Sequence, residues 1–425
     1  MAANVHDPHG ESLTSVNVTA CRMCEGQDLY PFLDLGSTPP ADQFLRDDQL
    51  KDPEVFYPLQ VLMCETCGLA QLSYCVPPEI LYQRDYPYEA STTRAGREHW
   101  ARFARTVVRD LGIEPGALVV DIGSNVGVLL SAFADCGMQV KGVDPAPNIV
   151  EKACAAGIDT ICDFFGARAA EQIVAEKGQA SVITGTNVFA HVGDLVAFMR
   201  AVEMLLAPRG VLIVEAPYFA NLVAYTEYDT IYHEHLSYLS VKPLVAFFSR
   251  FGMDVFDVRQ VEIHGGSFRV FVGRQGTRPV SPEVPRLLGM EEETELHSRS
   301  TLDAFARAVQ QNRRDLVWLL HRIKAEGKRI AAVSAPAKGM TLLNYCKIDG
   351  EILDFVTEKS TLKIGRYTPG SHIKVAADAH LLAERPDYAL LLAWNFADEI
   401  MTNLDAYRQQ GGRFIIPIPT PRIVS

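Results

Sequence analysis

The spacing of apolar residues predicts alternating helices and strands in the middle of the chain. In residues 91–111 the side chains of Trp100, Phe103, Val107 and Val108 recur at helical spacing, which predicts an amphipathic helix. A short apolar run at 118–120 then meets a glycine-containing turn. The same alternation continues to residue 273 through the segments SVITGTNVF, GVLIVEAP and VEIHGGSFRVFVG. We therefore predict a central α/β domain, Rossmann-like, with a largely parallel sheet.

A second, smaller alternation follows a polar helical stretch. Residues 280–326 are rich in Glu and Arg and have a helical pattern, which predicts a bridging segment. After it, KRIAAVSAPAKGMTLLNYC has the pattern of a strand, a loop and a helix. Further strands are expected in ILDFVTE, YALLLAW and GGRFIIPIP. We predict a second Rossmann-like α/β domain there. The expected division is 1–82, 83–278, 279–326 and 327–425.

Composition and charge narrow the class of protein. Hydrophobic residues make up 48% and charged residues 22%, as in soluble globular proteins. The formal net charge of −12 opposes binding to nucleic acid or to an anionic membrane. No apolar run approaches the roughly 20 residues of a membrane span, and residues 1–20 lack the pattern of a signal peptide. We expect a cytoplasmic protein that acts on a small molecule, with an architecture compatible with a monomer.

Two cysteine pairs predict a zinc site. Cys21 and Cys24 form one C-x2-C pair, and Cys64 and Cys67 form another about forty residues later. Paired spacing of this kind is typical of four-thiolate zinc sites, whereas four unrelated core thiols would not need it. Because four thiolates leave no open position for water, the ion is expected to be structural.

The turn after the first central strand indicates which nucleotide the sheet binds. Its residues run Asp121-Ile-Gly123-Ser-Asn-Val-Gly127, without the middle glycine of a dinucleotide fingerprint. Such a turn suits a ligand without phosphates, and Asp121 suits the cationic amino-acid part of S-adenosylmethionine. Asp144 ends the next strand, where a carboxylate can accept hydrogen bonds from both ribose hydroxyls. Asp163 ends the third strand, within reach of an adenine amino group; an ordinary turn and a solvated surface carboxylate are the alternatives.

The segment DTIYHEHLSYLS concentrates proton-handling side chains. On a helix Tyr232 and His235 would share a face, whereas on a strand His233 would pair with His235. Together with Glu234 these residues could supply a base and proton donors. We expect His233 to be a core histidine, as a single histidine on an apolar face usually is. A metal site built on His-Glu-His is the alternative, but no third ligand of matching spacing is evident. His191 follows the strand in GTNVF, whose end is expected to face the transferred group.

Several segments, taken in order, give this chain a family resemblance. They are the two C-x2-C pairs and DIGSN, GTNVFAHV, YDTIYHEHLSY, HGGSFR, APAKGMTLLNYC, GRYTPGSHI and RPDYALLLAWNF. Over residues 21–419 the chain resembles the sugar C-methyltransferases that act on nucleotide-linked 4-keto-deoxyhexoses, above all those that methylate C-3 of antibiotic sugars. The resemblance implies a zinc-binding region, a class I S-adenosylmethionine methyltransferase and a C-terminal Rossmann-like domain. It also implies methyl transfer to C-3 of a TDP-4-keto sugar in deoxysugar biosynthesis.

The resemblance also implies roles for individual residues. It favours His235 as general base and Tyr232 as a contact to the sugar oxygen, with Glu234 either orienting the imidazole or taking the proton itself. Tyr86, in DYPYEAS, corresponds to a further active-site tyrosine. Asn187, beside the strand in GTNVFAHV, is assigned to both cofactor and substrate binding. The chemistry is consistent, because a ketone at C-4 acidifies the proton on C-3.

Other basic residues are candidates for the nucleotide diphosphate. The loop APAKGMT follows a strand and opens a helix, so its amides, Lys338 and Gly339 could meet a pyrophosphate; an ordinary turn is the alternative. Arg366, His372 and Arg269 are further candidates, with solvated side chains or a strand-end bulge as alternatives. Two other function classes stay open: an NAD-dependent nucleotide-sugar oxidoreductase, which the glycine spacing opposes, and a zinc-ribbon adaptor without catalysis.

Overall fold

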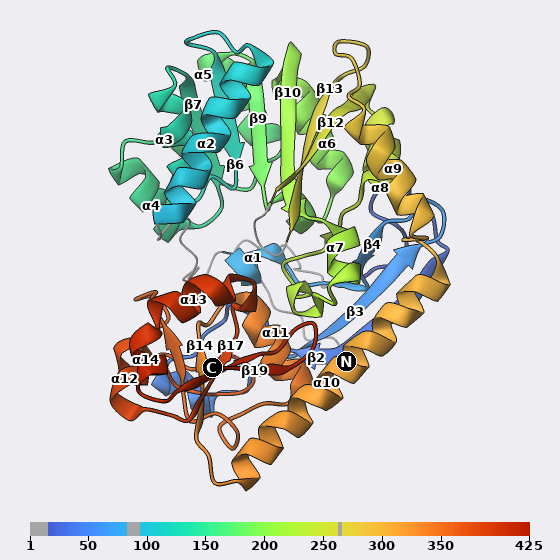
Figure 1. The fold of residues 1–425 in the computed structure, drawn as a ribbon. Helices are drawn as coiled ribbons and strands as arrows, with labels where there is room; N and C mark the ends of the chain where they lie inside the picture. Colours follow the sequence, from blue (N-terminus) through green and yellow to red (C-terminus); the bar gives the residue numbers. More distant parts are fainter. Residues whose placement is uncertain (1–15, 83–93, 262–265) are drawn as a thin grey trace.

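The protein was analysed as a computed structural model that describes residues 16–82, 94–261 and 266–425. An upper α/β body, a small N-terminal sheet and a lower α/β body are visible in Figure 1. A long helix runs along the N-terminal sheet and the lower body. The predicted Tyr86 lies outside the described residues.

The upper body is a seven-stranded sheet in the order β12-β13-β10-β9-β6-β7-β8, and only β13 runs in the opposite direction to the other strands. Its strands are β6 (Leu118–Ile122), β7 (Gln139–Asp144), β8 (Thr160–Cys162), β9 (Ala180–Thr186), β10 (Leu206–Pro217), β12 (Met253–Val261) and β13 (Ser267–Arg274). The chain leaves β6 toward β7 and β8, then returns to β9 on its other side. This reversal creates a switch point at the carboxyl edge between β6 and β9, where ligands bind in such sheets.

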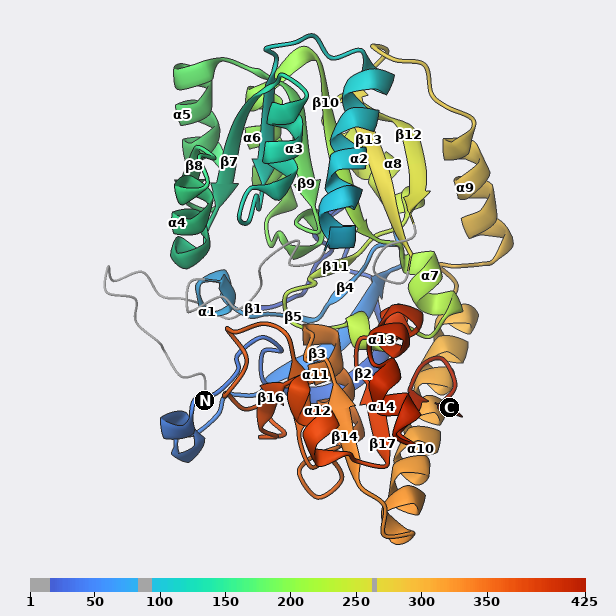
Figure 2. The ribbon, with the colours of Figure 1, turned by 60° about the vertical axis from the view of Figure 1, so that its left-hand side comes forward.

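Helices cover both faces of this sheet (Figure 2). On one face lie α2 (Arg94–Leu111), α3 (Val128–Asp135) and α4 (Pro147–Ala155); on the other lie α5 (Ala167–Lys177), α6 (Leu195–Leu205) and α8 (Val241–Ser249). The predicted amphipathic helix is α2. It buries Phe103 and Val107 against the sheet, as its apolar spacing predicts. The predicted doubly wound α/β domain is confirmed.

The N-terminal region forms an antiparallel sheet in the order β11-β4-β3-β2. Its strands are β2 (Leu29–Thr38), β3 (Tyr57–Cys64), β4 (Ala70–Leu72) and β11 (Ser237–Tyr238). A two-stranded ribbon, η1 and α1 complete the region: β1 (Val16–Asn17), β5 (Tyr74–Cys75), η1 (Asp47–Lys51) and α1 (Pro78–Tyr82). Because β11 comes from the chain after β10, the N-terminal sheet includes a strand that the central part of the chain supplies.

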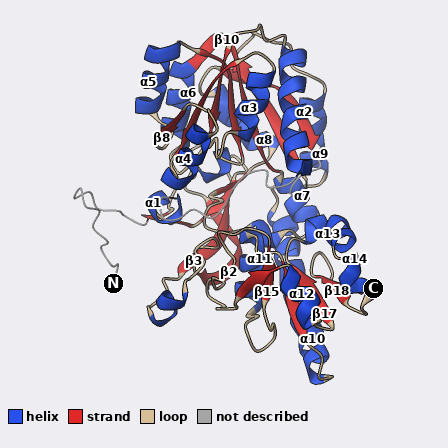
Figure 3. Ribbon diagram, turned by 90° about the vertical axis from the view of Figure 1, so that its left-hand side faces the viewer, coloured by secondary structure: helices blue, strands red, loops and turns tan. Residues whose placement is uncertain are grey.

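The lower body is a six-stranded sheet in the order β16-β15-β14-β17-β18-β19, with only β19 antiparallel. Figure 3 shows its strands in red with helices packed beside them. Its strands are β14 (Ile330–Val333), β15 (Val356–Glu358), β16 (Val375–Ala377), β17 (Tyr388–Leu391), β18 (Arg413–Ile416) and β19 (Arg422–Val424). Its helices are α11 (Ala337–Cys346), α12 (Ala379–Glu384), η4 (Trp394–Phe396), α13 (Ala397–Asn403) and α14 (Asp405–Gln409). This confirms the second Rossmann-like domain, with its own switch point between β14 and β17.

The predicted bridging segment consists of α9 (Glu283–Glu293) and α10 (Arg299–Ala325). In α10 an apolar stripe that includes Leu302, Phe305 and Leu316 is buried in a core shared with the N-terminal sheet and the lower body. The segment is therefore a packed part of the structure. None of the helices in the described part of the chain has the length and apolar character that a bilayer crossing requires.

Candidate active site

The four predicted zinc ligands come together in the N-terminal region. The sulfur atoms of Cys21 and Cys67 lie 3.5 Å apart, those of Cys24 and Cys64 lie 3.4 Å apart, and all four lie within 4.8 Å of one another. A tetrahedral zinc ion with bonds of about 2.3 Å needs sulfur–sulfur edges of about 3.8 Å. The donor set and its spacing therefore fit zinc, and the prediction of a structural zinc site is confirmed.

The zinc knuckles are tied to the central part of the chain. Gly68 has a φ of +85°, and a Cβ at this position would lie 2.8 Å from the His297 ring. His297 Nε2 in turn lies 2.9 Å from the hydroxyl of Ser240, the residue before α8. From the other knuckle, the Arg22 guanidinium donates to the backbone carbonyl of Leu236, next to the proposed base His235, at 3.1 Å. The zinc site thus braces the segment that carries the candidate catalytic residues.

The glycine turn after β6 lies at the switch point. Gly123 and Gly127 have φ values of +66° and +79°, a region that favours glycine. A Cβ on Gly123 would lie 2.3 Å from a methyl group of Val188, so the close approach also requires glycine. The Gly123 amide donates to the Val143 carbonyl at 2.8 Å, which holds the turn against the end of β7.

Two buried carboxylates flank this turn. Asp121 accepts a hydrogen bond from the Thr184 hydroxyl at 2.6 Å, and burial, with the nearby Asp144, raises its pKa to about 7. Asp144 accepts from the backbone amides of Asn125 and Ala146 at 2.9 and 3.0 Å, and burial raises its pKa as well. Buried carboxylates of this kind are stabilised by a positive ligand. The pair therefore fits S-adenosylmethionine, which carries a sulfonium and an ammonium group.

The other predicted cofactor contacts are placed differently. The Asp163 carboxylate pairs with the Arg168 guanidinium and accepts from the Phe164 amide at 2.9 Å, so in this structure its oxygens already have protein partners. Asn187, with a φ of +57°, directly follows β9, and its backbone amide donates to the Glu215 backbone carbonyl at 2.7 Å. Asn187 thus lies at the carboxyl edge, four residues before His191.

A row of four rings forms the centre of the candidate site. Tyr82, at the end of α1, lies against His191 of η2 (Phe189–His191), with ring centres 6.1 Å apart. The His191 ring lies 4.9 Å from that of His235, which in turn lies 4.0 Å from the Tyr232 ring. We call these four residues the aromatic row. Three of them were predicted from the sequence, and the structure brings them together from three distant segments.

The backbone around His235 determines what its imidazole can do. The predicted segment is neither a regular helix nor a strand: after η3 (Tyr228–Thr230) a turn is closed by the His235 amide and the Tyr232 carbonyl at 2.9 Å. His235 Nδ1 donates to the Thr230 carbonyl at 2.8 Å. Because Nδ1 carries the proton in that bond, the lone pair of the neutral ring is on Nε2. This is the tautomer that a general base needs.

His233 points to the opposite side. Its Nε2 lies 3.2 Å from the Tyr57 carbonyl, its ring meets the Tyr57 ring edge-on, and burial lowers its pKa to about 4. It therefore packs in the N-terminal sheet, as a core histidine does. Among the described residues the only group arranged to hold a metal ion is the cysteine cluster, so the structure gives the His-Glu-His metal alternative no support.

Glu234 is buried beside the aromatic row. Only 4% of its surface is exposed, and its negative charge adds to burial in raising the pKa of the Tyr82 phenol. The effect places the carboxylate on the same side as Tyr82. The position is compatible with either role that was left open for Glu234, orienting an imidazole or taking a proton.

Lys338 lies at the switch point of the lower sheet, but its charge has a protein partner. Its ammonium nitrogen lies 3.7 Å from the fully buried Asp229 carboxylate, 4.6 Å from the centre of the Trp394 ring and 3.2 Å from the Asn395 side-chain oxygen. The Trp394 indole also donates to Asp229 at 2.7 Å. These contacts join the lower body to the segment that immediately precedes Tyr232. Lys338 is thus one member of a buried polar cluster and shares its charge with Asp229.

Two predicted substrate contacts are explained by packing instead. A Cβ on Gly339 would lie 2.7 Å from that of Leu392, so glycine here lets α11 approach the end of β17. Arg269 is buried in β13, where its Nε donates to the Glu215 carboxylate at 2.8 Å and its guanidinium lies 3.7 Å from the Phe103 ring centre. These contacts do not support the sequence prediction that Arg269 contacts the sugar nucleotide, because Glu215 binds the N–H edge of the guanidinium and Phe103 lies against one of its faces.

The remaining candidates lie in one loop of the lower body. His372 Nε2 lies 2.9 Å from the Glu54 carboxylate, which links the loop to the N-terminal region. Arg366 lies next to the bridge between Tyr367 and Lys374 and is partly buried. The role of Arg366 and His372 in binding stays a prediction.

Sequence analysis missed Tyr82 and the pairing of Asp229 with Trp394. The stretch LYQRDYPYEA has three tyrosines in seven residues, a signal that could have extended the search from Tyr86 to Tyr82. Asp229 and Trp394 are 165 residues apart, and no local pattern connects them.

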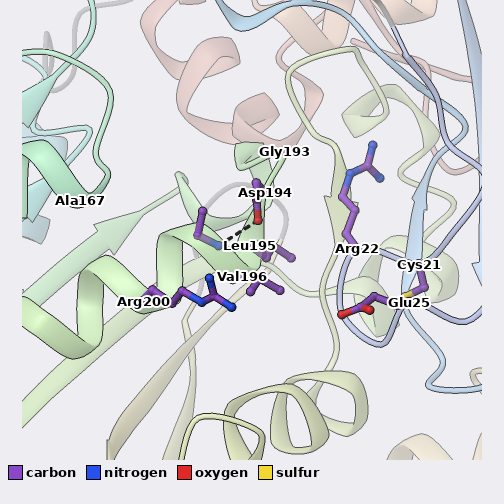
Figure 4. Close-up of a pocket in the computed structure, with 10 residues that line it drawn as sticks. Cys21, Arg22, Glu25, Ala167, Gly193, Asp194, Leu195, Val196 and Arg200 are labelled. Atoms are coloured by element: carbon purple, nitrogen blue, oxygen red, sulfur yellow. Dashed lines mark hydrogen bonds between the residues drawn. The ribbon is translucent and has the colours of Figure 1, made fainter.

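A cavity of about 600 Å³ lies outside the aromatic row, between a zinc knuckle and the start of α6 (Figure 4). Its lining includes Arg22, Glu25, Asp194 and Arg200, and the Asp194 carboxylate caps α6 by accepting from the Ala197 amide at 2.8 Å. No residue of the aromatic row lines it. The cavity is therefore separate from the candidate active site.

Comparison with family models divides the chain into three matched parts. Residues 21–82 match a family described as "Putative zinc binding domain", residues 96–258 match "Methyltransferase domain", and residues 262–419 match "C-methyltransferase C-terminal domain". The zinc match covers the cysteine cluster, and the methyltransferase match covers the glycine turn and three members of the aromatic row, His191, Tyr232 and His235.

One curated relative matches along almost the whole chain. The C-methyltransferase NovU of Streptomyces niveus is 36% identical over 409 residues, which is 96% of this chain and 97% of that protein. A ubiquinone biosynthesis O-methyltransferase of Xanthomonas campestris pv. campestris is 34% identical over 100 residues, which is 23% of this chain and 42% of the relative.

Among solved structures, the magnesium protoporphyrin IX methyltransferase ChlM from Synechocystis PCC 6803 with bound SAH is similar, with a TM-score of 0.34 and 16% identity. That match covers 45% of this chain and 91% of ChlM. The plantazolicin methyltransferase BpumL in complex with a pentazolic desmethylPZN analog and SAH gives a TM-score of 0.35 at 10% identity, and the match covers 43% of this chain and 87% of that chain.

Proposed function

We propose a substrate and a mechanism from the premise that this chain belongs to the family of C-methyltransferases. The enzyme takes its methyl group from S-adenosylmethionine and holds a structural zinc ion. The proposed acceptor is C-3 of a nucleotide-linked 4-keto-deoxyhexose, with TDP as the nucleotide, in the synthesis of a branched sugar for an antibiotic. The observation that carries the proposal is the 2.8 Å contact between His235 Nδ1 and the Thr230 carbonyl, because it assigns the basic nitrogen Nε2 to a buried row of proton-handling rings.

Methylation at carbon requires that the acceptor lose a proton. The Thr230 carbonyl holds the proton of His235 on Nδ1, so Nε2 can accept the C-3 proton of the sugar. The electron pair of the C–H bond then forms the C-3–C-4 double bond, and the C-4 oxygen gains negative charge. We assign the hydrogen bond to this oxygen to the phenol of Tyr232, whose ring centre lies 4.0 Å from that of His235.

The second step forms the carbon–carbon bond. S-adenosylmethionine supplies an electrophilic methyl group on a positively charged sulfur. C-3 of the enolate would take this methyl group with the electron pair of the C-3–C-4 double bond, and the C-4 carbonyl would re-form. The sulfur would keep the electrons of the broken sulfur–carbon bond and leave as S-adenosylhomocysteine, while the proton taken from C-3 would stay on His235. Asp121 and Asp144 are the groups proposed to hold the cationic donor at the carboxyl edge of the sheet, where burial has raised the pKa of both.

The surroundings keep water from the enolate. His235 is 8% exposed and Glu234 is 4% exposed, and the N-terminal sheet continues directly from them through β11. On the other side the Asp229–Trp394 bond attaches the lower body. Such a dry site strengthens each hydrogen bond to the developing charge.

We place the nucleotide toward the lower body, where the start of α11 and Lys338 lie beside the central segment. A diphosphate there would share the ammonium group with Asp229. An NAD-dependent oxidoreductase gains no support, because the turn at Gly123 lacks the middle glycine that lets a pyrophosphate approach.

The test is a methyl-transfer assay with S-adenosylmethionine labelled in its methyl group and TDP-4-keto-deoxyhexoses that carry either an amino or a hydroxyl group at C-3. We expect labelled product, and exchange of the C-3 proton in D2O when S-adenosylhomocysteine replaces the donor. His235→Asn should abolish both. The function is refuted if wild-type enzyme shows neither label transfer nor exchange with any of these sugars.

A further inference from the structure

Tyr82 makes a directed contact with one nitrogen of His191. The phenol oxygen lies 3.1 Å from Nδ1, and the two rings are nearly parallel, with an angle of 12° between their planes. The other nitrogen, Nε2, is buried and has no hydrogen-bond partner among the described residues. His191 therefore has one nitrogen bound by Tyr82 and the other left to meet a ligand.

The surroundings of Tyr82 and His191 favour the state in which both side chains are neutral. Burial, assisted by the Glu234 carboxylate, raises the pKa of the Tyr82 phenol well above its usual value, so the hydroxyl keeps its proton. Burial, assisted by His235, lowers the pKa of His191 well below its usual value, so the imidazole is neutral. A neutral imidazole has one protonated nitrogen and one acceptor. If Tyr82 donates to Nδ1, the proton of His191 must be on Nε2.

We propose that Tyr82 is a positioning residue that holds His191 as the Nε2–H tautomer, so that His191 donates a hydrogen bond to the C-4 oxygen of the acceptor as that oxygen gains charge. The mechanistic part rests on the proposed function. The tautomer itself concerns this chain alone and can be measured without any acceptor.

The two histidines of the aromatic row then have opposite tautomers and opposite roles. His235 keeps its proton on Nδ1, against the Thr230 carbonyl, and presents a lone pair on Nε2. His191 presents a proton on Nε2. Their ring centres are 4.9 Å apart, and when His235 becomes cationic after taking the C-3 proton, a neutral neighbour avoids repulsion between two charged rings. A neutral N–H donor also stabilises an enolate oxygen without transferring its proton to it.

The ordinary alternative is that Tyr82 only packs against His191 at the end of a short helix. That role needs the tyrosine ring but not its hydroxyl group. Tyr82→Phe separates the two possibilities, because it removes the donor to Nδ1 and keeps the ring. Tyr225→Phe is the matched control, since it removes a hydroxyl group from a tyrosine that is 53% exposed.

The tautomer is read by nitrogen NMR on the full-length zinc protein labelled with ¹⁵N-histidine, and the His191 signals are assigned by their loss in His191→Gln. We expect an Nε2–H signal for wild type and for Tyr225→Phe, and a mixture of tautomers for Tyr82→Phe. A wild-type His191 protonated on Nδ1 would overturn the proposal, whether or not any sugar is turned over.

Steady-state kinetics with the accepted sugar supply the second readout. Losing a well-placed oxyanion donor lowers kcat by about 10²–10³-fold, so a mixture of tautomers should lower kcat about tenfold or more with KM within about twofold. Tyr82→Gln, whose amide can donate to Nδ1, should recover part of the loss and also serves if the Phe variant fails to fold. Unchanged kcat in Tyr82→Phe, with His191 still protonated on Nε2, would show that the hydroxyl group does not position His191.

Discussion

Substitution of Arg269 tests whether this residue binds substrate or stabilises the fold, because its proposed substrate role and its observed contacts predict different results. In the structure its guanidinium is paired with Glu215, whose side chain is fully buried, and stacks on Phe103. Arg269→Met keeps much of the side-chain volume but leaves the Glu215 carboxylate without its guanidinium partner. Removing one member of a buried ion pair costs about 3–5 kcal/mol, and losing the contact with the aromatic ring adds about 1–2 kcal/mol.

The partner variant isolates the ion pair. Glu215→Gln combined with Arg269→Met replaces both charges with neutral groups, and such replacements are often neutral in stability, within about 1 kcal/mol. We therefore expect the single Arg269→Met variant to be much less stable than the double variant. The free energy of unfolding is measured by urea titration with tryptophan fluorescence, to which Trp100 on α2 contributes.

A substrate-binding arginine would behave differently. Both variants would then have a raised KM for the sugar nucleotide, while the single variant would keep wild-type stability. Arg269→Met with an unchanged urea midpoint and a strongly raised KM would refute the structural assignment.

Three further predictions concern pH, zinc and the glycine turn. Burial lowers the pKa of His233 to about 4, so its contribution to stability is complete above the unfolded pKa of about 6.5 and is lost as pH falls toward 4. Between pH 7.5 and 5, the free energy of unfolding of wild type, measured by urea titration, should therefore fall by about 2 kcal/mol more than that of His233→Gln. Cys64→Ala should abolish zinc binding, measured by metal analysis, and should lower both the melting temperature and kcat. Gly123→Ala should weaken S-adenosylmethionine binding at least tenfold by calorimetry, because a Cβ there meets Val188; Gly116→Ala, with a similar φ of +80° and open space around it, should not.

Each of these has a contrary result. Equal pH dependence in wild type and His233→Gln would mean that His233 is not buried in its neutral form. A Cys64→Ala enzyme with wild-type kcat would show that the zinc site does not brace the catalytic segment. If Gly123→Ala and Gly116→Ala lost the same affinity for S-adenosylmethionine, the cause would be backbone strain and not the close approach of Val188.

Features that depend on nearby residues were predictable from sequence. The spacing within Cys21/Cys24 and Cys64/Cys67 determines the zinc site, because each pair forms one turn that presents two sulfur atoms. Asp121 was predictable because a residue at the end of a parallel strand lies at the ligand-binding edge. The alternation of apolar runs likewise identified both Rossmann-like domains.

Features that depend on pairing across the chain were not predictable. Arg269 was taken for a ligand contact because its partner Glu215, 54 residues away, cannot be recognised from sequence. The charged surface of α10 obscured the apolar stripe on its other side. The order of the rings in the aromatic row depends on a turn, an α-helix end and a 3-10 helix, and such irregular backbone has no periodic pattern to detect.

Residues 16–82 cannot be exchanged between related proteins as an independent unit, because β4 in this region pairs with β11 from the central part of the chain. An engineer who exchanged this region for that of a relative, in order to change the accepted substrate, would have to match the edge that receives Ser237 and Tyr238. A mismatch there would displace the segment that carries His235, although no residue of the aromatic row had been altered. Chimeras of these enzymes should therefore be joined outside both strands, with the two segments inherited from the same parent.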